Sequence, residues 1–582
     1  MFWRTAATTL VLLLACFSGA SLRADRLAVR VPPATGDSQA SSDIDPADAA
    51  ISNAALKWNQ RVVLPRLDAK GGWQRYIDTW STLNTAAAAE SNRRDQTLRR
   101  YLGVDRVAAV GRLSKPSRPP RHVPWKRGEF IRIVSPLVWV DSSANQAETE
   151  AIITDLTRCY WAWTQLFFPF WKAGTQWTAD SLPATAVPGD RQSLRIAPDE
   201  LIKQLRGAKP LPSPGPMKVV LFRDRQQYLQ VLSPHVPGIA QSTGYYDDRN
   251  RVSYFYVGDD ADVIRTRRHE WTHQLFRQAT RNRLGRKSPG EHPDFWAVEG
   301  VACFFESLDF DKQWCFVGGW DRSRLQFARH RVLVAGQNLS LQYLRGLNQS
   351  AVTGLDNLPQ WYSFSGAWTH RVMEGNEAER EWFYRTLAAI YKATPQSAPE
   401  TPAGLEGSLA DFLRVDDDDI REDHCVGSPA EVCLATCKIS PIVLQSIPRS
   451  ENLRWLDLSG IRCDNETLAG LWTNQSPLQR LSLERCGIDD ALSERLPSAA
   501  ELRELDISFN SVGDALIESM ATQPLEILYA TGSRIGDASL EILVKVPTLK
   551  ILDVQLTRVT GAALERFKAS RPDVQLNPLE LR

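Results

Sequence analysis

Apolar and polar residues in the middle of the chain follow strand and helix periods in turn. Runs of β-branched and aromatic residues at 130–134 and 218–222 predict strands, and residues 244–257 predict a hairpin. Further helices are expected at about 262–281 and 294–308. Helical spacing also predicts one long helix, whose core face comprises Ile152, Leu156, Cys159, Trp163 and Leu166. Residues 129–397 are therefore expected to form one α+β domain within a multidomain α/β chain.

Leucines recur at a nearly fixed interval from residue 453 to the end of the chain. Five segments open with versions of L-x-x-L-x-L, spaced by 25, 24, 23 and 24 residues, at Leu453, Leu478, Leu502, Leu525 and Leu549. Self-similarity at this period is typical of a leucine-rich repeat, in which strand-plus-helix units stack into a solenoid. We expect an α/β leucine-rich repeat domain over 453–582, preceded by a linker and repeat cap over 398–452.

Strand residues between the core leucines should face one concave surface. The first column is Trp455, Arg480, Glu504, Ile527 and Ile551, and the second is Asp457, Ser482, Asp506, Tyr529 and Asp553. This mixture of side chains suits a protein partner better than nucleic acid. Trp455 and Tyr529 are the expected anchors, because amphipathic aromatic residues bury a large area at small entropic cost. The alternative is that the repeats only form a stable C-terminal module.

The first residues predict export. Arg4 precedes an uncharged run with small residues that offer cleavage sites, so residues 1–24 are expected to be a signal peptide. An uncleaved anchor and a bacterial lipoprotein acylated at Cys16 are the alternatives. We expect a periplasmic, cell-surface or secreted protein that meets a membrane only through such an anchor. Three further segments are expected: a flexible tether over 25–50, a helical region over 51–113, and a Pro-rich basic linker over 114–128.

Composition narrows the function classes only slightly. A chain of 582 residues needs several domains, and 43% apolar with 24% charged residues is typical of folded soluble protein. Lys and Arg number 69 against 68 Asp and Glu, which disfavours nucleic acid as a partner. Cys425, Cys433 and Cys437 lie close together without the spacing of common zinc fingers, so we interpret them as structural thiols or a disulfide cap.

The first of the two adjacent predicted helices carries an H-E-x-x-H motif at His269, Glu270 and His273. Positions i and i+4 share a helix face, so both imidazoles can meet one metal ion while Glu270 projects beside them. Glu299 follows His273 by 26 residues on the next predicted helix and is a candidate third ligand. This donor set is typical of Zn²⁺.

H-E-x-T-H followed by W-x-x-E-G-x-A resembles the gluzincin group of zinc metallopeptidases, notably peptidase-like domains of secreted planctomycete proteins of unknown function. The resemblance covers about residues 130–393, without a counterpart for the Pro-rich insertion at 175–216. It implies a zincin-like fold in which His269, His273 and Glu299 hold Zn²⁺. It also implies that Glu270 is the general base that takes a proton from zinc-bound water.

The same resemblance suggests further roles around the motif. Tyr362 is the best match for a donor to the oxyanion, with His370 as second choice; the alternative for Tyr362 is an ordinary core aromatic. Glu306 is expected either to orient a ligand or to be an exposed helix carboxylate. The strand at 252–257 is expected to bind substrate at the sheet rim, or to be an interior strand. A solvated basic face is expected from Arg265, Arg267, Arg268, Arg277, Arg281 and Arg283.

The leading hypothesis is an exported zinc metallopeptidase that cleaves a peptide or protein substrate, with repeats that bind a partner or position the substrate. One alternative is a catalytically inactive, peptidase-like adhesion or scaffold protein. Another is a zinc hydrolase of non-peptide amides, which would use the same residues. The peptidase and repeat domains are expected to be independent, so that removing residues after about 423 would leave metal binding intact.

Overall fold

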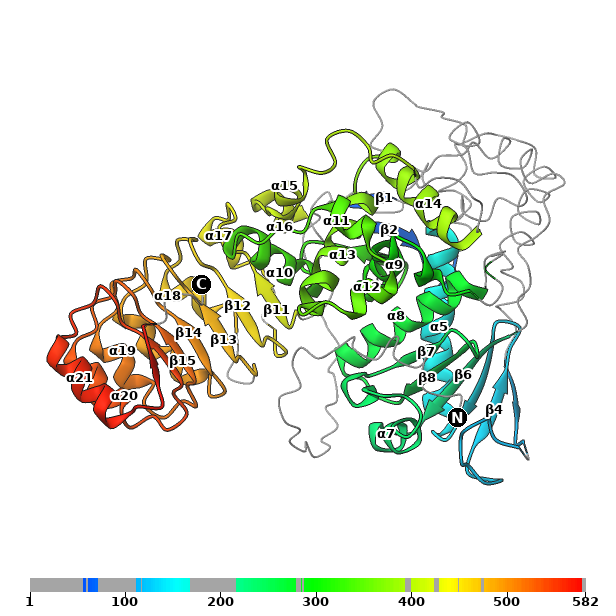
Figure 1. Cartoon of the computed structure of the whole chain (residues 1–582), viewed down its shortest axis with the longest axis horizontal. Coiled ribbons are helices and arrows are strands. Elements are labelled where there is room, and N and C mark those ends of the chain that lie inside the picture. The colour runs from blue at the N-terminus through cyan, green and yellow to red at the C-terminus, as the bar shows by residue number, and fades with distance from the viewer. Residues whose placement is uncertain are drawn as a thin grey trace, which may run out of the picture.

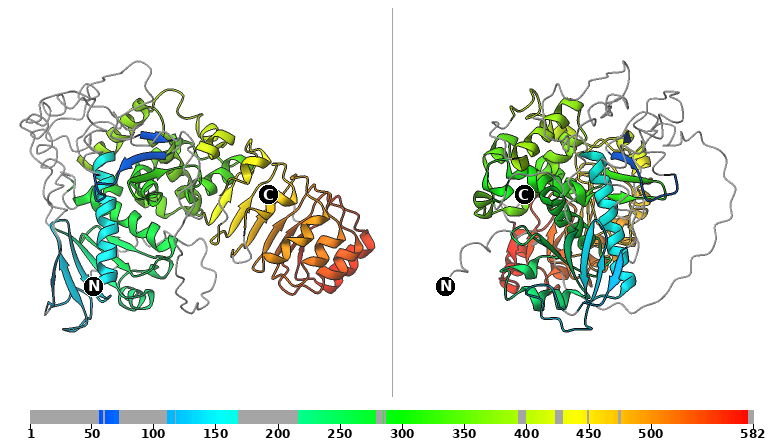
Figure 2. Two further views of the ribbon diagram at one scale, coloured as in Figure 1. Left: turned by 180° about the vertical axis from the view of Figure 1, so that it is seen from behind. Right: turned by 90° about the vertical axis from the view of Figure 1, so that its right-hand side faces the viewer.

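The computed structural model describes residues 56–58, 61–71, 111–116, 118–167, 216–278, 284, 287–392, 399–422, 429–447, 450–472 and 476–577. The predicted signal peptide with Cys16, the tether, most of 51–113 and nearly all of the insertion at 175–216 lie outside these residues, as does Cys425. The described residues form an α/β part (56–422) and a repeat part (429–577) that extends from one end of it (Figures 1 and 2). No helix within the described ranges has both the length and the apolar character needed to cross a membrane.

A six-stranded sheet, in the order β3-β4-β5-β6-β8-β7, forms one side of the α/β part. Its strands are β3 (Arg112–Ser114), β4 (Ile131–Val134), β5 (Val138–Ser142), β6 (Met217–Phe222), β7 (Tyr245–Asp247) and β8 (Val252–Tyr256). β5, β6 and β8 are parallel, whereas β3, β4 and β7 are antiparallel to their neighbours. The predicted strand at 252–257 is therefore the interior strand β8, and the terminal strand is β7.

Three long helices follow the predicted periodicity. α5 (Gln146–Leu166) begins at a capping box formed by Asn145 and Glu148 and buries all five predicted core residues. α8 (Ala261–Gln278) and α9 (Phe295–Glu306) confirm the two predicted helices at the H-E-x-x-H and Glu299 segments. α8 packs on α5, where Trp271 Nε1 donates to the Leu156 carbonyl at 3.0 Å.

The remaining helices complete the α/β part. Their bounds are α7 (Arg225–Leu232), α10 (Ser323–Arg329), α11 (Leu341–Gly346), α12 (Gln349–Thr353), α13 (Leu358–Met373), α14 (Glu377–Lys392), α15 (Leu409–Leu413) and α16 (Asp417–Glu422), with short 3₁₀ turns at Ile239–Gln241 and Pro289–Glu291. A π-helix, η5 (His330–Val334), directly follows α10. Figure 1 shows α9, α10 and α13 between the six-stranded sheet and the repeats.

The described residues of the predicted helical region 51–113 form strands and a turn and no helix, so that prediction was wrong for them. β1 (Leu56–Trp58) and β2 (Arg61–Pro65) form a second sheet with β10 (Trp314–Gly318) and β9 (Asp309–Phe310). The helical pattern came from an alanine-rich stretch outside the described residues, whereas β2 is rich in β-branched residues. Buried Arg61 donates to Asp321 at 2.6 Å, which anchors β2 in the α/β part.

The repeat part is a parallel sheet of seven strands with short helices along one of its two faces (Figure 1). The strands are β11 (Glu431–Cys433), β12 (Trp455–Asp457), β13 (Arg480–Ser482), β14 (Glu504–Asp506), β15 (Ile527–Tyr529), β16 (Ile551–Asp553) and β17 (Gln575–Leu576). The helical turns are α17 (Pro441–Leu444), α18 (Asn465–Ala469), η6 (Asp490–Glu494), η7 (Leu496–Ser498), α19 (Asp514–Ser519), α20 (Asp537–Leu543) and α21 (Gly561–Ser570). The middle core leucines stand in register from Leu456 to Leu552 and are buried. β11, within the predicted cap, extends the sheet by one strand.

Candidate metal centre

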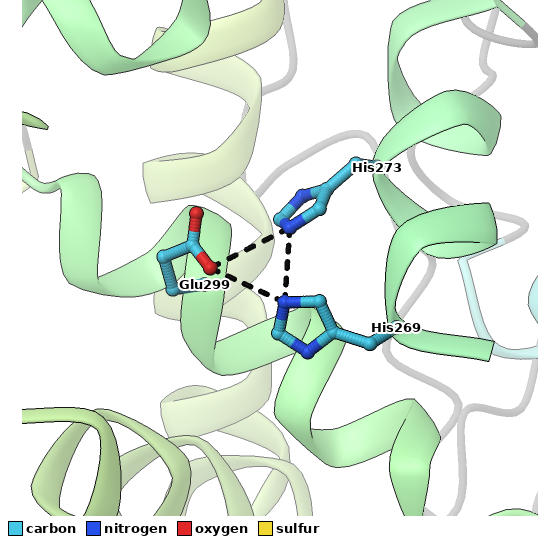
Figure 3. A group of neighbouring side chains, drawn as sticks. All are labelled: His269, His273 and Glu299. Atoms are coloured by element: carbon cyan, nitrogen blue, oxygen red, sulfur yellow. Dashed lines mark hydrogen bonds and ion pairs between the residues drawn. The ribbon is translucent and has the colours of Figure 1, made fainter. Parts of the chain in front are cut away.

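Helices α8 and α9 bring three donor side chains to one point. His273 Nε2 lies 3.1 Å from His269 Nε2, and Glu299 Oε2 lies 3.3 Å from the first histidine and 3.5 Å from the second (Figure 3). The three residues are 2%, 7% and 1% exposed for His269, His273 and Glu299. The predicted ligands therefore converge from two helices, in a largely buried site.

The donor set fits a single zinc ion. The centre of a triangle with these three sides lies about 1.9 Å from each corner, so one ion can reach all three atoms at the about 2.0–2.2 Å of zinc ligands. Within the described residues, the second carboxylate oxygen of Glu299, Oε1, is buried and accepts no hydrogen bond. A buried anionic oxygen without a donor is costly, and a bound cation would offset that cost.

Charge in the site favours an ionised third ligand. Burial acts to raise the pKa of Glu299, but His273 and His269 outweigh it and lower the pKa to about 2. Burial acts to lower the pKa of His269, but hydrogen bonds with Cys303, Glu299 and Glu306 raise it well above its ordinary value. The cluster therefore combines an anionic carboxylate with the His269 imidazole, whose surroundings favour a bound cation.

The outer nitrogen of His269 is held by a second carboxylate. His269 Nδ1 lies 2.9 Å from Glu306 Oε1, so a proton on Nδ1 leaves Nε2 with its lone pair toward Glu299. The Glu306 side chain is only 9% exposed, which makes the exposed-carboxylate interpretation wrong. His269, Cys303 and Glu306 form another close group, but Glu306 is already paired with Arg324 at 2.8 Å. We assign Glu306 to support of His269.

Glu270 lies beside the donors and is fixed from the sheet. It is 1% exposed, and its Oε2 accepts from the backbone N–H of Tyr246 on β7 at 2.9 Å. Burial raises the pKa of Glu270 to about 7, against the lowering effect of His269 and His273. A carboxylate with this pKa exchanges a proton near neutral pH, as a general base must. Only the motif, not the Tyr246 contact, was visible in the sequence.

The two candidates for the oxyanion donor have different surroundings. Tyr362 is buried on α13, and its ring lies 5.8 Å from the Arg324 guanidinium. Burial and the nearby carboxylates of Glu299 and Glu270 raise the pKa of Tyr362 well above its ordinary value, so its hydroxyl keeps its proton. His370 instead contacts Glu374 at 2.7 Å and packs on the Phe304 ring. Tyr362 remains the candidate.

The predicted solvated arginine face is wrong for the described arginines of α8. Arg267 and Arg268 both pair with Asp155 of α5, the latter at 2.8 Å. Arg277 is 2% exposed and lies 2.8 Å from Asp248. Sequence periodicity could not show this, because each partner comes from another element. The ion pairs fix the metal-site helix, while Arg281 and Arg283 lie outside the described residues.

Trp455 is not available as an anchor for a partner, contrary to expectation. It is 7% exposed and stacks on Phe327 at 5.1 Å, with His330 edge-on at 5.6 Å. Tyr529 is half-buried on the concave face. Three acidic concave residues serve the repeat turns instead: Asp457, Asp506 and Asp553 each accept the backbone N–H two residues further along.

Cys433 and Cys437 are buried free thiols, in agreement with a structural role. Cys433 Sγ lies 3.9 Å from Asp457 Oδ2, and Cys437 Sγ accepts from the Val415 N–H at 3.4 Å. Both thiols pack where the linker meets the first repeat strands.

Comparison with known proteins finds similarity to solved structures over part of the chain. No protein-family model and no curated protein matches the sequence. An internalin of Listeria monocytogenes matches with 17% identity and a TM-score of 0.21, over 26% of this chain and 48% of that one. Internalin C2 of the same organism matches with 17% identity and a TM-score of 0.18, over 28% and 83%. The parallel register of β11 to β17 and the recurring buried leucines show that the C-terminal part of this chain is a leucine-rich repeat domain.

Proposed function

We propose that this chain is an exported zinc-dependent metallopeptidase whose repeats bind a protein partner or position a protein substrate. The convergence of His269, His273 and Glu299 beside the buried carboxylate of Glu270 carries this proposal. Bound Zn²⁺ would supply a Lewis acid that polarises a peptide carbonyl and lowers the pKa of a coordinated water toward about 7.

The protein groups supply the proton transfer and the charge stabilisation. Glu270, held by the Tyr246 N–H and with a pKa of about 7, accepts the proton of the attacking water and returns it to the leaving amine. The protonated hydroxyl of Tyr362 donates a hydrogen bond to the oxyanion that develops on the carbonyl. Both groups are buried, where such interactions are stronger than in water.

Strand β7 is the element suited to hold an extended substrate. Among the described strands it pairs only with β8, and the Tyr246 N–H points away from β8 to Glu270. The outer edge of β7 therefore faces the metal centre, and a peptide added along this edge would pass the reacting groups. The sequence placed this role on 252–257, but β8 is enclosed between β6 and β7.

Glu270→Gln tests the proposal, because glutamine keeps the shape of the side chain but cannot act as the base. The variant should bind one zinc per chain and lose hydrolysis of a quenched fluorescent peptide library by at least about a hundredfold. Glu379→Gln is the matched control: it is a buried helix glutamate that pairs with Arg371, outside the metal centre. It should retain both properties.

The assay also separates the alternatives. Zinc-loaded wild-type protein that cleaves no peptide but hydrolyses cell-wall amides would favour the non-peptide hydrolase. Protein that binds zinc and hydrolyses neither would favour the scaffold. Retention of full peptidase activity by Glu270→Gln would contradict the assigned mechanism.

A further inference from the structure

We propose that Arg324 is a positioning residue for His269, and that the docked repeats hold the helix that carries it. The inference rests on the metal binding in the proposed function and goes beyond it. It connects two parts of the chain that the sequence presents as independent modules.

Arg324 is connected to the metal centre through Glu306. Arg324 Nη2 and Nε donate to Glu306 Oε1 and Oε2 at 2.8 and 2.9 Å, a two-pronged contact that fixes the carboxylate plane. Glu306 Oε1 in turn lies 2.9 Å from His269 Nδ1. The same guanidinium lies over the Tyr362 ring. Arg324 therefore sets the orientation of one metal-binding imidazole and contacts the candidate oxyanion donor.

Helix α10, which carries Arg324, also contacts the repeats. Arg329, at the end of α10, is 1% exposed and donates to the carbonyls of Leu413 at 2.7 Å and Cys433 at 2.8 Å. Gln326 accepts from the Cys433 N–H at 2.8 Å, and Phe327 stacks on Trp455. α10 thus presents Arg324 to the metal centre and its following residues to β11 and β12.

A separate contact joins the repeats to the metal-site helix itself. Arg454 Nη2 lies 3.0 Å from Glu431 and 3.3 Å from Asp262 in the first turn of α8. Arg265, one helical turn before His269, lies 3.8 Å from Glu431. The first two repeat strands therefore contact both elements that orient His269.

The length of α10 makes this support necessary. It has seven residues and continues directly into the π-helix η5. A helix this short has little stability of its own and keeps its place through packing. It lies between α13, where a Cβ on Gly366 would stand 3.3 Å from Arg324 Cβ, and the repeat strands. Loss of the repeat contacts would leave α10 supported on one side.

The role of Arg324 in positioning His269 is tested by the zinc affinity of the full chain, measured in competition with a chromophoric chelator. Arg324→Met should weaken zinc binding by about 10–100-fold, the usual effect of losing such a support, and Arg324→Lys should recover part of it. The visible spectrum of the Co²⁺-loaded Arg324→Met variant should shift, because His269 is no longer fixed. Arg371→Met is the matched control: its pair with Glu379, at 2.7 Å and with side chains 17% and 9% exposed, mirrors Arg324 with Glu306 at 18% and 9%.

Two variants at the contact between α10, α8 and the repeats test whether the repeats support the metal centre. Arg454→Gln removes the ion pairs to Glu431 and Asp262, and Trp455→Ala removes the stack on Phe327. Each should weaken zinc binding several-fold, and Arg454→Gln, a part-exposed residue, should do so without unfolding the chain.

Each outcome is decisive. Equal zinc affinity in Arg324→Met and Arg371→Met would overturn the role of Arg324. Wild-type affinity in both Arg454→Gln and Trp455→Ala would overturn the role of the repeats. Wild-type protein that fails to bind zinc would instead overturn the proposed function, which separates the two failures.

Discussion

Gly300 offers a direct test of how helix packing sets the metal centre. It follows Glu299 on α9 and lies against α13. A Cβ at this position would stand 2.1 Å from Thr369 Oγ1 and 2.7 Å from the carbonyl oxygen of Ser365. The carbonyl belongs to the α13 backbone, so rotation of a side chain cannot relieve that contact. Gly300→Ala should therefore push α9 away from α13.

The size of the effect follows from two opposing terms. Replacing glycine by alanine inside a helix stabilises it by about 1 kcal/mol, whereas overpacking a buried contact costs about 1–3 kcal/mol. Thr369 is fully buried and donates to the Ser365 carbonyl at 2.9 Å, so moving it also costs a hydrogen bond of about 1 kcal/mol. A net destabilisation of about 1–3 kcal/mol is expected. Glu299 moves with α9, and metal sites tolerate only about 0.2 Å, so zinc affinity should fall roughly tenfold or more.

Thermal unfolding and chelator competition measure the two effects. Gly346→Ala, where a Cβ would meet nothing within 4 Å, should leave zinc affinity and stability unchanged or slightly improve the latter. Adding Thr369→Ala to Gly300→Ala should recover part of the loss, because it removes the contact with Thr369 Oγ1. The recovery should be incomplete, because the contact with the Ser365 carbonyl remains. A Gly300→Ala protein with wild-type stability and zinc affinity would refute the assigned packing.

Two further predictions concern buried charges. Arg61→Met should lower the free energy of unfolding by about 1–3 kcal/mol in denaturant titrations, because buried Asp321 loses its 2.6 Å hydrogen bond with Arg61 and keeps the longer contact with Arg322 at 3.3 Å, while the same change at exposed Arg414 should have almost no effect. Burial raises the pKa of Asp457 from 3.8 in the unfolded chain to about 6 in the folded protein. Between these two pH values the folded protein holds a proton that the unfolded chain has released. The free energy of unfolding therefore falls as the pH rises from about 4 to about 6 and stays lower above pH 6. Asp457→Asn should therefore raise the free energy of unfolding by up to about 3 kcal/mol at pH 7.5 and leave it unchanged at pH 4, and an equal shift at both pH values would contradict this cause.

The sequence predicted those features that depend on local periodicity. Helices α5, α8 and α9 lie where apolar spacing placed them, and His269 with His273 needs only an i, i+4 relation on one helix. Glu299 was identifiable because it lies on the next helix along the chain. The repeat strands were predictable because each unit repeats the same local pattern.

Features that depend on contacts between distant elements could not be predicted. Asp155 lies 113 residues before Arg268, so the ion pair that buries this arginine has no local signal. The repeat pattern places Trp455 on the concave face, but does not show that Phe327 covers it. Similarly, the sequence left open whether Glu306 orients a ligand or is an exposed helix carboxylate, and it gave no sign of the Arg324 contact from α10.

The expectation that the peptidase-like and repeat parts are independent stays a prediction, but the contacts of Arg329 and Trp320 argue against it. Arg329 belongs to the α/β part, yet one of its buried hydrogen bonds ends on the Cys433 carbonyl of β11. Trp320, from the same part, is 1% exposed and packs in the hydrophobic cluster of the repeats with Val415 and Val432. A chain ending near residue 423 would expose this indole and remove an acceptor from a buried guanidinium, and each change carries a cost of the order of 1–3 kcal/mol. We therefore expect a chain that ends near residue 423 to be less stable than the full chain and to bind zinc more weakly, and equal zinc affinity of the two chains would contradict this.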